Sequence, residues 1–279
     1  MMATMEATRT RRGPGLAPRA LRFLGGQLVT LWAALALAYL FLPILVMVLF
    51  SFNDLEGRFN FVWQGFTLEH WRHPFRDPAL GDAMLLSLRI AAISTVIATA
   101  LGTLVAVAMV RYRFFGAGPT NFLILLPLAT PEIVLGASLL SLFLELNIQT
   151  GFTTIVIAHV MFNISYVVVT VRARLRGFDW TLEEAAMDLG ANEIQTFRKV
   201  TLPLIFPGIL AGALLAFALS LDDFIITLFN AGQEVTFPLY VWGVARVAAP
   251  PQVNVMGTMI LATTAGLIVL SLLMQRRRA

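Results

Sequence analysis

The stretch EEAAMDLGANEIQTFRKVTLP, from Glu183 to Pro203, is a polar segment between two long apolar ones. The whole chain is 58% apolar and only 13% charged, which is far from the composition of a soluble domain. A polar stretch of about twenty residues does not fit inside a lipid-facing core. The segment therefore marks a place where the chain leaves its apolar surroundings.

Two short helices with a tight corner are predicted for this segment. Thr181-Leu-Glu-Glu184 has the spacing of a capping box, and Gly190 suits the left-handed residue beyond a helix C-terminus. Asn192-Glu-Ile-Gln195 repeats the capping pattern, and Leu202-Pro203 is expected to end the second helix. Each helix has a small apolar stripe: Ala185, Ala186 and Leu189 on the first, and Ile194, Phe197 and Val200 on the second. Such a pair suits docking into a groove on another protein, or packing against its own chain.

Composition excludes several classes of function. The 279 residues include no cysteine, which excludes disulfides, thiolate catalysis and cysteine-ligated metal sites. The only lysine, Lys199, follows no GxxxxGK run, so the chain has no P-loop and cannot hydrolyse ATP by that route. The histidines, His70, His73 and His159, lack the spacing of metal ligands. We expect neither an enzyme nor a metal site.

Six stretches are long and apolar enough to cross a bilayer, which needs about 20 residues. They cover residues 28–50, 82–109, 120–144, 153–171, 204–229 and 253–274. The fold class is therefore predicted to be all-α, a polytopic membrane protein with six transmembrane helices. Its expected parts are an N-terminal arm over 1–27, a membrane domain over 28–274 with a polar loop at 172–203, and a tail over 275–279.

Basic residues predict the orientation, because they are enriched on the cytoplasmic side of a membrane. Fifteen fall on the side of the termini and the polar loop: Arg9, Arg11, Arg12, Arg19, Arg22, Arg111, Arg113, Arg172, Arg174, Arg176, Arg198, Lys199, Arg276, Arg277 and Arg278. Four fall on the other side: Arg58, Arg72, Arg76 and Arg246. Both termini and the polar loop are therefore expected to be cytoplasmic, and topology explains these arginines better than nucleic acid binding does.

The polar segment resembles the EAA loop of the membrane subunits of ABC importers. Glu184-Ala185-Ala186, three residues, Gly190, nine residues, Val200, one residue and Leu202-Pro203 follow the spacing of that family, with Val200 in place of isoleucine. Further segments are similar to the second membrane subunit of spermidine/putrescine importers: Asn60 to Trp71, Val110 to Gly116, Pro131 to Leu140, Arg174 to Ala191 and Leu219 to Phe229.

This resemblance implies the type I importer fold and a permease subunit in a bacterial inner membrane, carrying spermidine or putrescine. It implies as partners two ABC ATPase subunits that bind ATP and magnesium, a second homologous permease subunit and an extracytoplasmic substrate-binding protein, with no cofactor in this chain. The residues that it places at the ATPase are Glu183, Glu184, Ala185, Ala186, Leu189, Gly190, Ala191, Phe197, Leu202 and Pro203. Another small amine or an amino-acid-like substrate stays an alternative, as does a stand-alone cation channel or transporter.

Two adjacent aspartates, Asp222 and Asp223, lie in the fifth predicted span. At the centre of a membrane helix each would cost about 2.5–3.5 kcal/mol, so they are expected to have a function. Neighbours on a helix point about 100° apart. Asp223 falls on the side of a small-residue ladder typical of helix packing, which is formed by Gly208, Gly212, Ala216 and Ser220. Asp223 is therefore predicted to point into the bundle, with Asp222 beside it; the alternative is that the pair holds a neighbouring helix or caps the outer loop.

A third acid, Glu132, follows Pro131, whose missing N–H is expected to kink the third span. Kinked backbone beside a carboxylate suits the lining of a cavity, and internal pairing of Glu132 is the alternative. Three acids suit a polyvalent cation, because each ammonium can meet a carboxylate while aromatic faces hold the methylenes. The aromatic candidates for the substrate path are Phe224, Tyr240, Trp242 and Tyr166, each of which could instead face lipid.

Overall fold

The computed structural model of the chain describes residues 16–57, 59–112, 114–247 and 250–276. The chain divides into two compact units, Met1–Pro74 with Pro250–Ala279, and Phe75–Ala249. Residues 1–15 of the predicted arm and 277–279 of the predicted tail lie outside the described residues. So do seven of the basic residues that predict the orientation: Arg9, Arg11, Arg12, Arg58, Arg113, Arg277 and Arg278.

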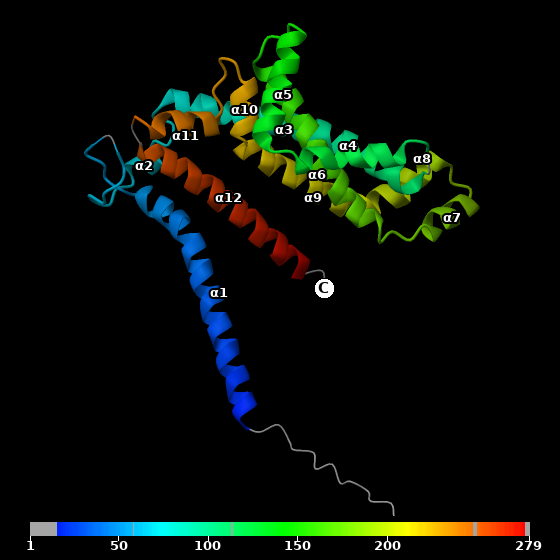
Figure 1. Cartoon of the computed structure of the whole chain (residues 1–279), viewed down its shortest axis with the longest axis horizontal. Helices are drawn as coiled ribbons and strands as arrows, with labels where there is room; N and C mark the ends of the chain where they lie inside the picture. The colour runs from blue at the N-terminus through cyan, green and yellow to red at the C-terminus, as the bar shows by residue number, and fades with distance from the viewer. Residues whose placement is uncertain (1–15, 58, 113, 248–249, 277–279) are drawn as a thin grey trace, which may run out of the picture. The chain divides into compact units, whose positions relative to one another are not determined.

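The larger unit, Phe75–Ala249, is a succession of helices (Figure 1). Its three longest helices are α3 (Pro78–Arg111), α6 (Phe152–Leu175) and α9 (Leu202–Asp222). The shorter ones are α4 (Ala117–Ala129), α5 (Glu132–Glu145), α7 (Thr181–Asp188), α8 (Glu193–Thr196), α10 (Ile225–Asn230) and α11 (Phe237–Ala245), with a π-helical segment, Phe197–Thr201, between α8 and α9. All the regular elements within the described ranges are helices, which confirms the all-α fold class.

The smaller unit contains α1 (Leu16–Phe50), α2 (Glu69–Arg72) and α12 (Pro251–Arg276). Its loop after α1 is organised by the buried Asn53, whose amide nitrogen donates to Asn60 Oδ1 at 2.6 Å and to the Val62 carbonyl at 2.8 Å. α1 and α12 pack closely, since a Cβ built on Gly257 would lie 2.7 Å from the sulfur of Met47. α12 covers the sixth predicted span, residues 253–274, and extends two residues beyond it at each end.

Small residues let α3, α6 and α9 approach one another in the core of the larger unit. Gly212 of α9 faces α6, where a Cβ would lie 3.5 Å from Val167, and Ser220 lies 3.0 Å from Ser94 of α3 between their hydroxyl oxygens. The buried residues of α9 include the four predicted members of the ladder: Gly208, Gly212, Ala216 and Ser220. The prediction that this ladder is a helix-packing face is therefore confirmed.

Gly102 offers a direct test of this packing. A Cβ at this position would lie 2.8 Å from two side-chain carbons of Val167, which is closer than van der Waals contact allows. We expect Gly102→Ala to lower the free energy of unfolding by about 1–3 kcal/mol through overpacking, read as a lower melting temperature in detergent. Gly118→Ala is the matched control, because nothing lies within 4 Å of a Cβ there. Equal melting temperatures for the two variants would contradict the packing.

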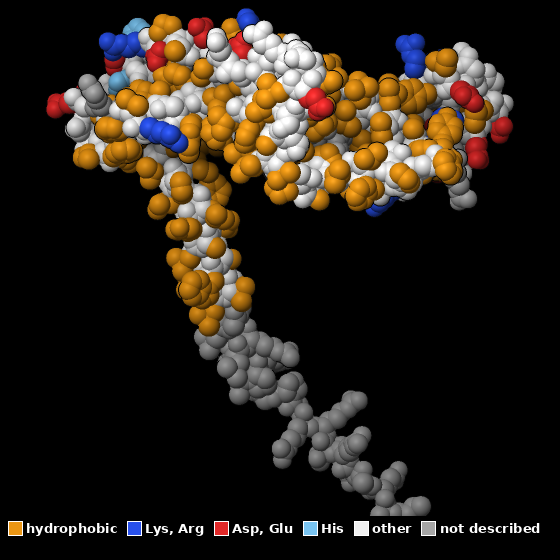
Figure 2. Space-filling view, turned by 45° about the horizontal axis from the view of Figure 1, so that its top comes forward, with side chains coloured by type: hydrophobic (Ala, Val, Ile, Leu, Met, Phe, Trp, Pro, Cys, Tyr) orange, Lys and Arg blue, Asp and Glu red, His pale blue; other side chains and the backbone are white. Residues whose placement is uncertain are grey.

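Four helices are long and apolar enough to cross a membrane in the part of the chain that the structure describes: Gln27–Phe50, Pro78–Arg111, Phe152–Leu175 and Glu193–Asp222. α4 and α5 pass the same test as a pair, although they are bent by 111° at the break between them. The kink predicted at Pro131 is thus confirmed and is a sharp break. Hydrophobic side chains cover much of the visible helical surface (Figure 2), as lipid-facing helices require. The count of six spans stays a prediction.

Candidate functional site

The first helix of the polar segment, α7, begins differently from the prediction. Asp179 Oδ1 accepts hydrogen bonds from the backbone N–H of Thr181 at 3.1 Å and from its hydroxyl at 2.8 Å. The capping box predicted between Thr181 and Glu184 is therefore wrong. The physical reason is that the carboxylate two residues upstream takes the Thr181 N–H, which the Glu184 side chain would have to bind, while the Glu184 N–H donates to the Trp180 carbonyl at 3.4 Å.

The corner between α7 and α8 is built as predicted. Gly190 has φ +88°, and its N–H donates to the Met187 carbonyl at 2.9 Å. Asn192 then caps α8, because its side-chain oxygen accepts from the backbone N–H of Gln195 at 2.9 Å and the Gln195 side chain accepts from the Asn192 N–H at 3.1 Å. Both the left-handed glycine and the second capping box are confirmed.

The second helix does not end at Leu202-Pro203, and this prediction is wrong. α8 passes through the π-helical segment Phe197–Thr201 directly into α9, and the N–H of Leu202 donates to the carbonyl of Phe197, five residues back. Pro203 stands in the first turn of α9, where its missing N–H is tolerated. A proline ring in the interior of an α-helix would clash with the preceding turn. The wider π turn before Pro203 makes room for the ring, so the helix continues through it.

The ten residues predicted at the ATPase divide by exposure. Five of them are exposed: Glu184, Ala185, Leu189, Gly190 and Pro203, of which Leu189 is 91% exposed. Four others, Ala186, Ala191, Phe197 and Leu202, are partly buried. Ile194 of α8 is also 72% exposed. Glu183, in contrast, is 3% exposed and faces the interior of the unit. The outward surface of α7 and α8, defined by Glu184, Ala185, Leu189 and Ile194, is hereafter the coupling face.

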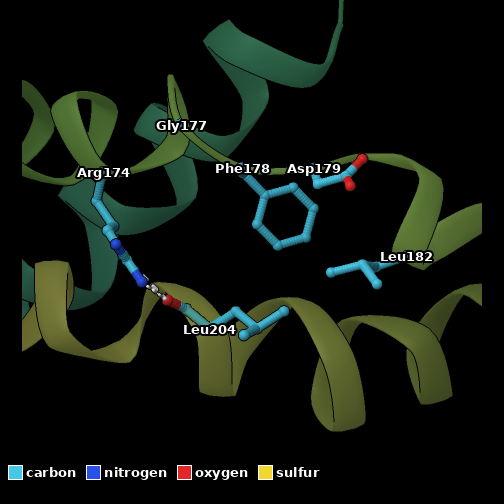
Figure 3. Close-up of a pocket in the computed structure, with 6 residues that line it drawn as sticks. All are labelled: Arg174, Gly177, Phe178, Asp179, Leu182 and Leu204. Carbon is cyan, nitrogen blue, oxygen red and sulfur yellow. Dashed lines mark hydrogen bonds between the residues drawn. The ribbon is translucent and has the colours of Figure 1, made fainter.

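A cavity of about 170 Å³ lies beside α7, where α6 ends and α9 begins (Figure 3). It is lined by Arg174, Gly177, Phe178, Asp179, Leu182 and Leu204. The Arg174 guanidinium donates to the Leu204 carbonyl from Nε at 3.2 Å and from a terminal nitrogen at 3.1 Å, which joins α6 to the first turn of α9. The cavity therefore combines apolar walls with an arginine whose direction is fixed.

Asp223 lies at the break between α9 and α10, and its side chain is only 6% exposed. One carboxylate oxygen accepts from the N–H of Thr227 at 2.8 Å and from its hydroxyl at 2.7 Å, and lies 3.2 Å from His159 Nε2. His159 is buried in α6, and its Nδ1 lies 2.6 Å from the Ser220 hydroxyl. Asp223 thus points into the bundle, where it both caps α10 and binds a neighbouring helix.

The other two acids are more open. Asp222 is exposed at the end of α9, and Glu132 is exposed at the start of α5 beside the bend. Glu132 interacts electrostatically with Asp223 and Asp222, and Tyr166 of α6 interacts with Glu132. Tyr166 also packs edge-on against Phe162, with ring centroids 4.9 Å apart. The structure therefore brings the three acids together where α9 ends and α5 begins, with Tyr166 from the middle of α6 beside Glu132.

The remaining aromatic candidates have partners of their own. The rings of Phe224 and Trp242 lie 5.1 Å apart, and the Arg246 guanidinium lies 4.5 Å from the centroid of Trp242. The Tyr240 hydroxyl donates to Asp77 at the start of α3. Burial and this hydrogen bond raise the pKa of the Tyr240 phenol to about 12, so it is a neutral donor at physiological pH. One face of Trp242 is thus already occupied by a cation.

The family described as binding-protein-dependent transport system inner membrane component matches residues 98–277. The chain belongs to this family. The matched residues include α5, α6, the coupling face, α9 and the three acids, and so cover both groups of candidate residues.

Several curated relatives align with most of this chain. It is 37% identical to the spermidine/putrescine transport system permease protein PotC of Haemophilus influenzae, over 86% of this chain and 93% of the relative. It is 39% identical to PotC of Escherichia coli strain K12, over 86% and 90%. It is 41% identical to the putrescine transport system permease protein PotI of the same strain, over 81% and 83%.

Two solved structures share the fold of this transport component. A bacterial ABC transporter involved in the import of the acidic polysaccharide alginate matches with a TM-score of 0.64 at 17% identity, over 95% of this chain and 98% of that chain. An amino acid ABC transporter matches with a TM-score of 0.57 at 18% identity, over 76% and 100%. The ABC-importer permease fold implied by the resemblance is therefore confirmed.

Sequence reasoning missed the polar network of this transport component around His159. His159 Nε2 lies 2.9 Å from the Thr227 hydroxyl, and Ser220 links the histidine to Ser94 of α3. A signal for it was present, because a histidine inside an apolar span is costly without a partner. Ser220, the last rung of the ladder, and Asp223, on the same side of the helix, were the available partners.

Proposed function

We propose that the chain is a transmembrane permease subunit of an ATP-driven ABC importer of polyamines, spermidine or putrescine. The observation that carries the proposal is the coupling face, a rigid corner at Gly190 with apolar side chains turned outward on a membrane protein that has no P-loop of its own. Relatives named for spermidine/putrescine transport, aligned over most of the chain, support the substrate.

In this proposal the complex contains two ABC ATPase subunits, a second homologous permease subunit and an extracytoplasmic substrate-binding protein. The ATPase subunits bind ATP and magnesium and contact the coupling face, so this chain needs no cofactor. Both termini and the coupling face are cytoplasmic in a bacterial inner membrane. ATP binding moves α7 and α8, and the bundle exchanges outward and inward access.

The substrate passes the acids at the bend of α5. Asp222 and Glu132 supply exposed carboxylates for the ammonium groups, with Tyr166 and Phe224 beside them for the methylenes. Asp223 contributes through its charge and its position, since its oxygens already bind His159 and α10. Tyr240 and Trp242 belong to the outer mouth of this path.

The test is uptake of labelled spermidine and putrescine by proteoliposomes that contain the purified complex. We expect uptake to require ATP, the ATPase subunits and the binding protein. Uptake by this chain alone without ATP would instead indicate a cation channel or transporter. Transport of gamma-aminobutyrate in preference to both polyamines would overturn the substrate and leave the importer role intact.

Asp222→Asn is predicted to raise the apparent KM for spermidine about tenfold, with the maximal uptake rate changed less than about twofold. The reason is that an exposed carboxylate is lost from the path, and one charge-assisted contact is worth about 1.5 kcal/mol. Initial uptake rates over a range of spermidine concentrations measure both constants. Asp82→Asn, also exposed but in α3, is the matched control. An unchanged KM in Asp222→Asn would remove this residue from the path.

A further inference from the structure

Glu183 and Glu184 are neighbours in sequence and face opposite ways. Glu184 is exposed on the coupling face, whereas the Glu183 side chain is only 4% exposed. A buried carboxylate is costly unless it is paired and hydrogen-bonded. Glu183 satisfies both conditions through residues of two other elements.

One carboxylate oxygen of Glu183 accepts from the hydroxyl of Thr201, which is completely buried. The other oxygen lies 3.2 Å from a guanidinium nitrogen of Arg111, whose side chain is 21% exposed. Arg111 is the last residue of α3, and Thr201 is the last residue of the π-helical segment before α9. Glu183 therefore joins α7 directly to the ends of two core helices.

Besides the contacts of Glu183, Trp180 at the start of α7 packs against the buried core of the larger unit. Figure 1 shows α7 and α8 at the end of the larger unit where α6 ends and α9 begins. The coupling face carries its largest apolar side chains outward, so they cannot transmit a displacement inward by packing. A charged pair and a hydrogen bond resist separation and fix direction better than an apolar contact does.

We propose that Glu183, Arg111 and Thr201 form an internal link that transmits movement of the coupling helix α7 to α3 and α9. Glu183 is a positioning residue that does not contact the ATPase, unlike Glu184. This inference rests on the proposed function, and it assigns separate tasks to the two glutamates: Glu184 binds the motor, and Glu183 carries its movement into the bundle.

The test measures labelled spermidine uptake and ATP hydrolysis in the same proteoliposomes, with co-purification of the ATPase subunits as the measure of assembly. Glu183→Gln keeps the volume and an acceptor for Thr201 but removes the charge that binds Arg111. We expect it to assemble normally, to keep ATP hydrolysis within about twofold and to lower uptake per ATP about tenfold. Glu145→Gln, an exposed glutamate at the end of α5, is the matched control and should be unchanged.

Two further variants distinguish a link from general damage to the fold. Thr201→Val removes only the hydroxyl and should lower uptake per ATP, whereas Thr201→Ser retains the hydroxyl and should keep it. The double variant Glu183→Gln/Arg111→Gln removes both charges and therefore leaves no unpaired one. It should be at least as stable to heat as Glu183→Gln and stay uncoupled; recovery of coupling in the double variant would overturn the link.

The inference and the proposed function fail in different ways. Absence of ATP-dependent uptake by the unsubstituted complex would contradict the proposed function itself. Uptake by the unsubstituted complex, with uptake per ATP unchanged in both Glu183→Gln and Thr201→Val, would contradict the link alone. If Glu183→Gln does not assemble, the comparison of uptake per ATP between Thr201→Val and Thr201→Ser tests the link instead.

Discussion

Gly190→Pro is expected to lower polyamine uptake by the assembled transporter by at least about tenfold. Gly190 has φ +88°, whereas proline is fixed near −65°, and the substitution also removes the N–H that donates to Met187. An L-residue in the left-handed region costs about 1–2 kcal/mol, and proline cannot enter it at all. The corner between α7 and α8 would open, and the coupling face would lose its shape.

A comparison with Gly190→Asn shows whether conformation is the cause. No atom lies within 4 Å of a Cβ built at Gly190, so a larger side chain meets no clash there. Asparagine tolerates the left-handed region better than other residues, and we expect Gly190→Asn to keep most of the uptake. ATP-dependent uptake and co-purification of the ATPase subunits are the measurements. Wild-type uptake in Gly190→Pro would rule out the corner as the contact with the motor.

His159→Leu is expected to destabilise the folded chain by at least about 1–3 kcal/mol, because it takes a hydrogen-bond partner from the buried Asp223 carboxylate. The substitution leaves Asp223, with 6% of its side chain exposed, without the ring nitrogen 3.2 Å away. It also removes the group that faces Ser220 and Thr227. Resistance to thermal and denaturant unfolding in detergent measures the loss.

The double variant His159→Leu/Asp223→Asn distinguishes the cost of an unpaired Asp223 carboxylate from the cost of losing the packing of the histidine ring. Asparagine keeps an oxygen that can accept from the Thr227 N–H, and it carries no charge that needs a partner. We therefore expect the double variant to be more stable than His159→Leu alone. If the double variant were equally unstable or worse, the pair would contribute nothing beyond the separate residues.

The local signals that the sequence carries at α8 and Gly190 predict their structure, because each depends on residues within four positions. Asn192 with Gln195 forms its capping box, and Gly190 adopts the left-handed conformation. The same kind of reasoning failed at α7, where two carboxylates could accept from the backbone N–H of Thr181. Asp179 is closer in sequence than Glu184 and binds this N–H. Local pattern alone does not rank two such competitors.

The site could be predicted only in part, because the missing contacts join residues far apart in the sequence. Asp223 was expected to point into the bundle from its place beside the ladder, and its side chain is buried there. Its partner His159 lies 64 positions earlier, and no spacing rule connects the two. Glu183 and Arg111 are 72 positions apart, so their pairing likewise needs the folded chain.

The π-helical segment Phe197–Thr201 affects how the coupling face is rotated relative to α9. A π turn holds one surplus residue, and each residue of a helix turns the face by about 100°. The rotational phase between the coupling face and the ladder of α9 is thus set by a single residue. Deleting or inserting one residue there would rotate the coupling face by about 100° about the helix axis relative to α9, while the residues of α9 kept their own contacts. The number of residues from Gly190 to Pro203 therefore determines an angle as well as a distance.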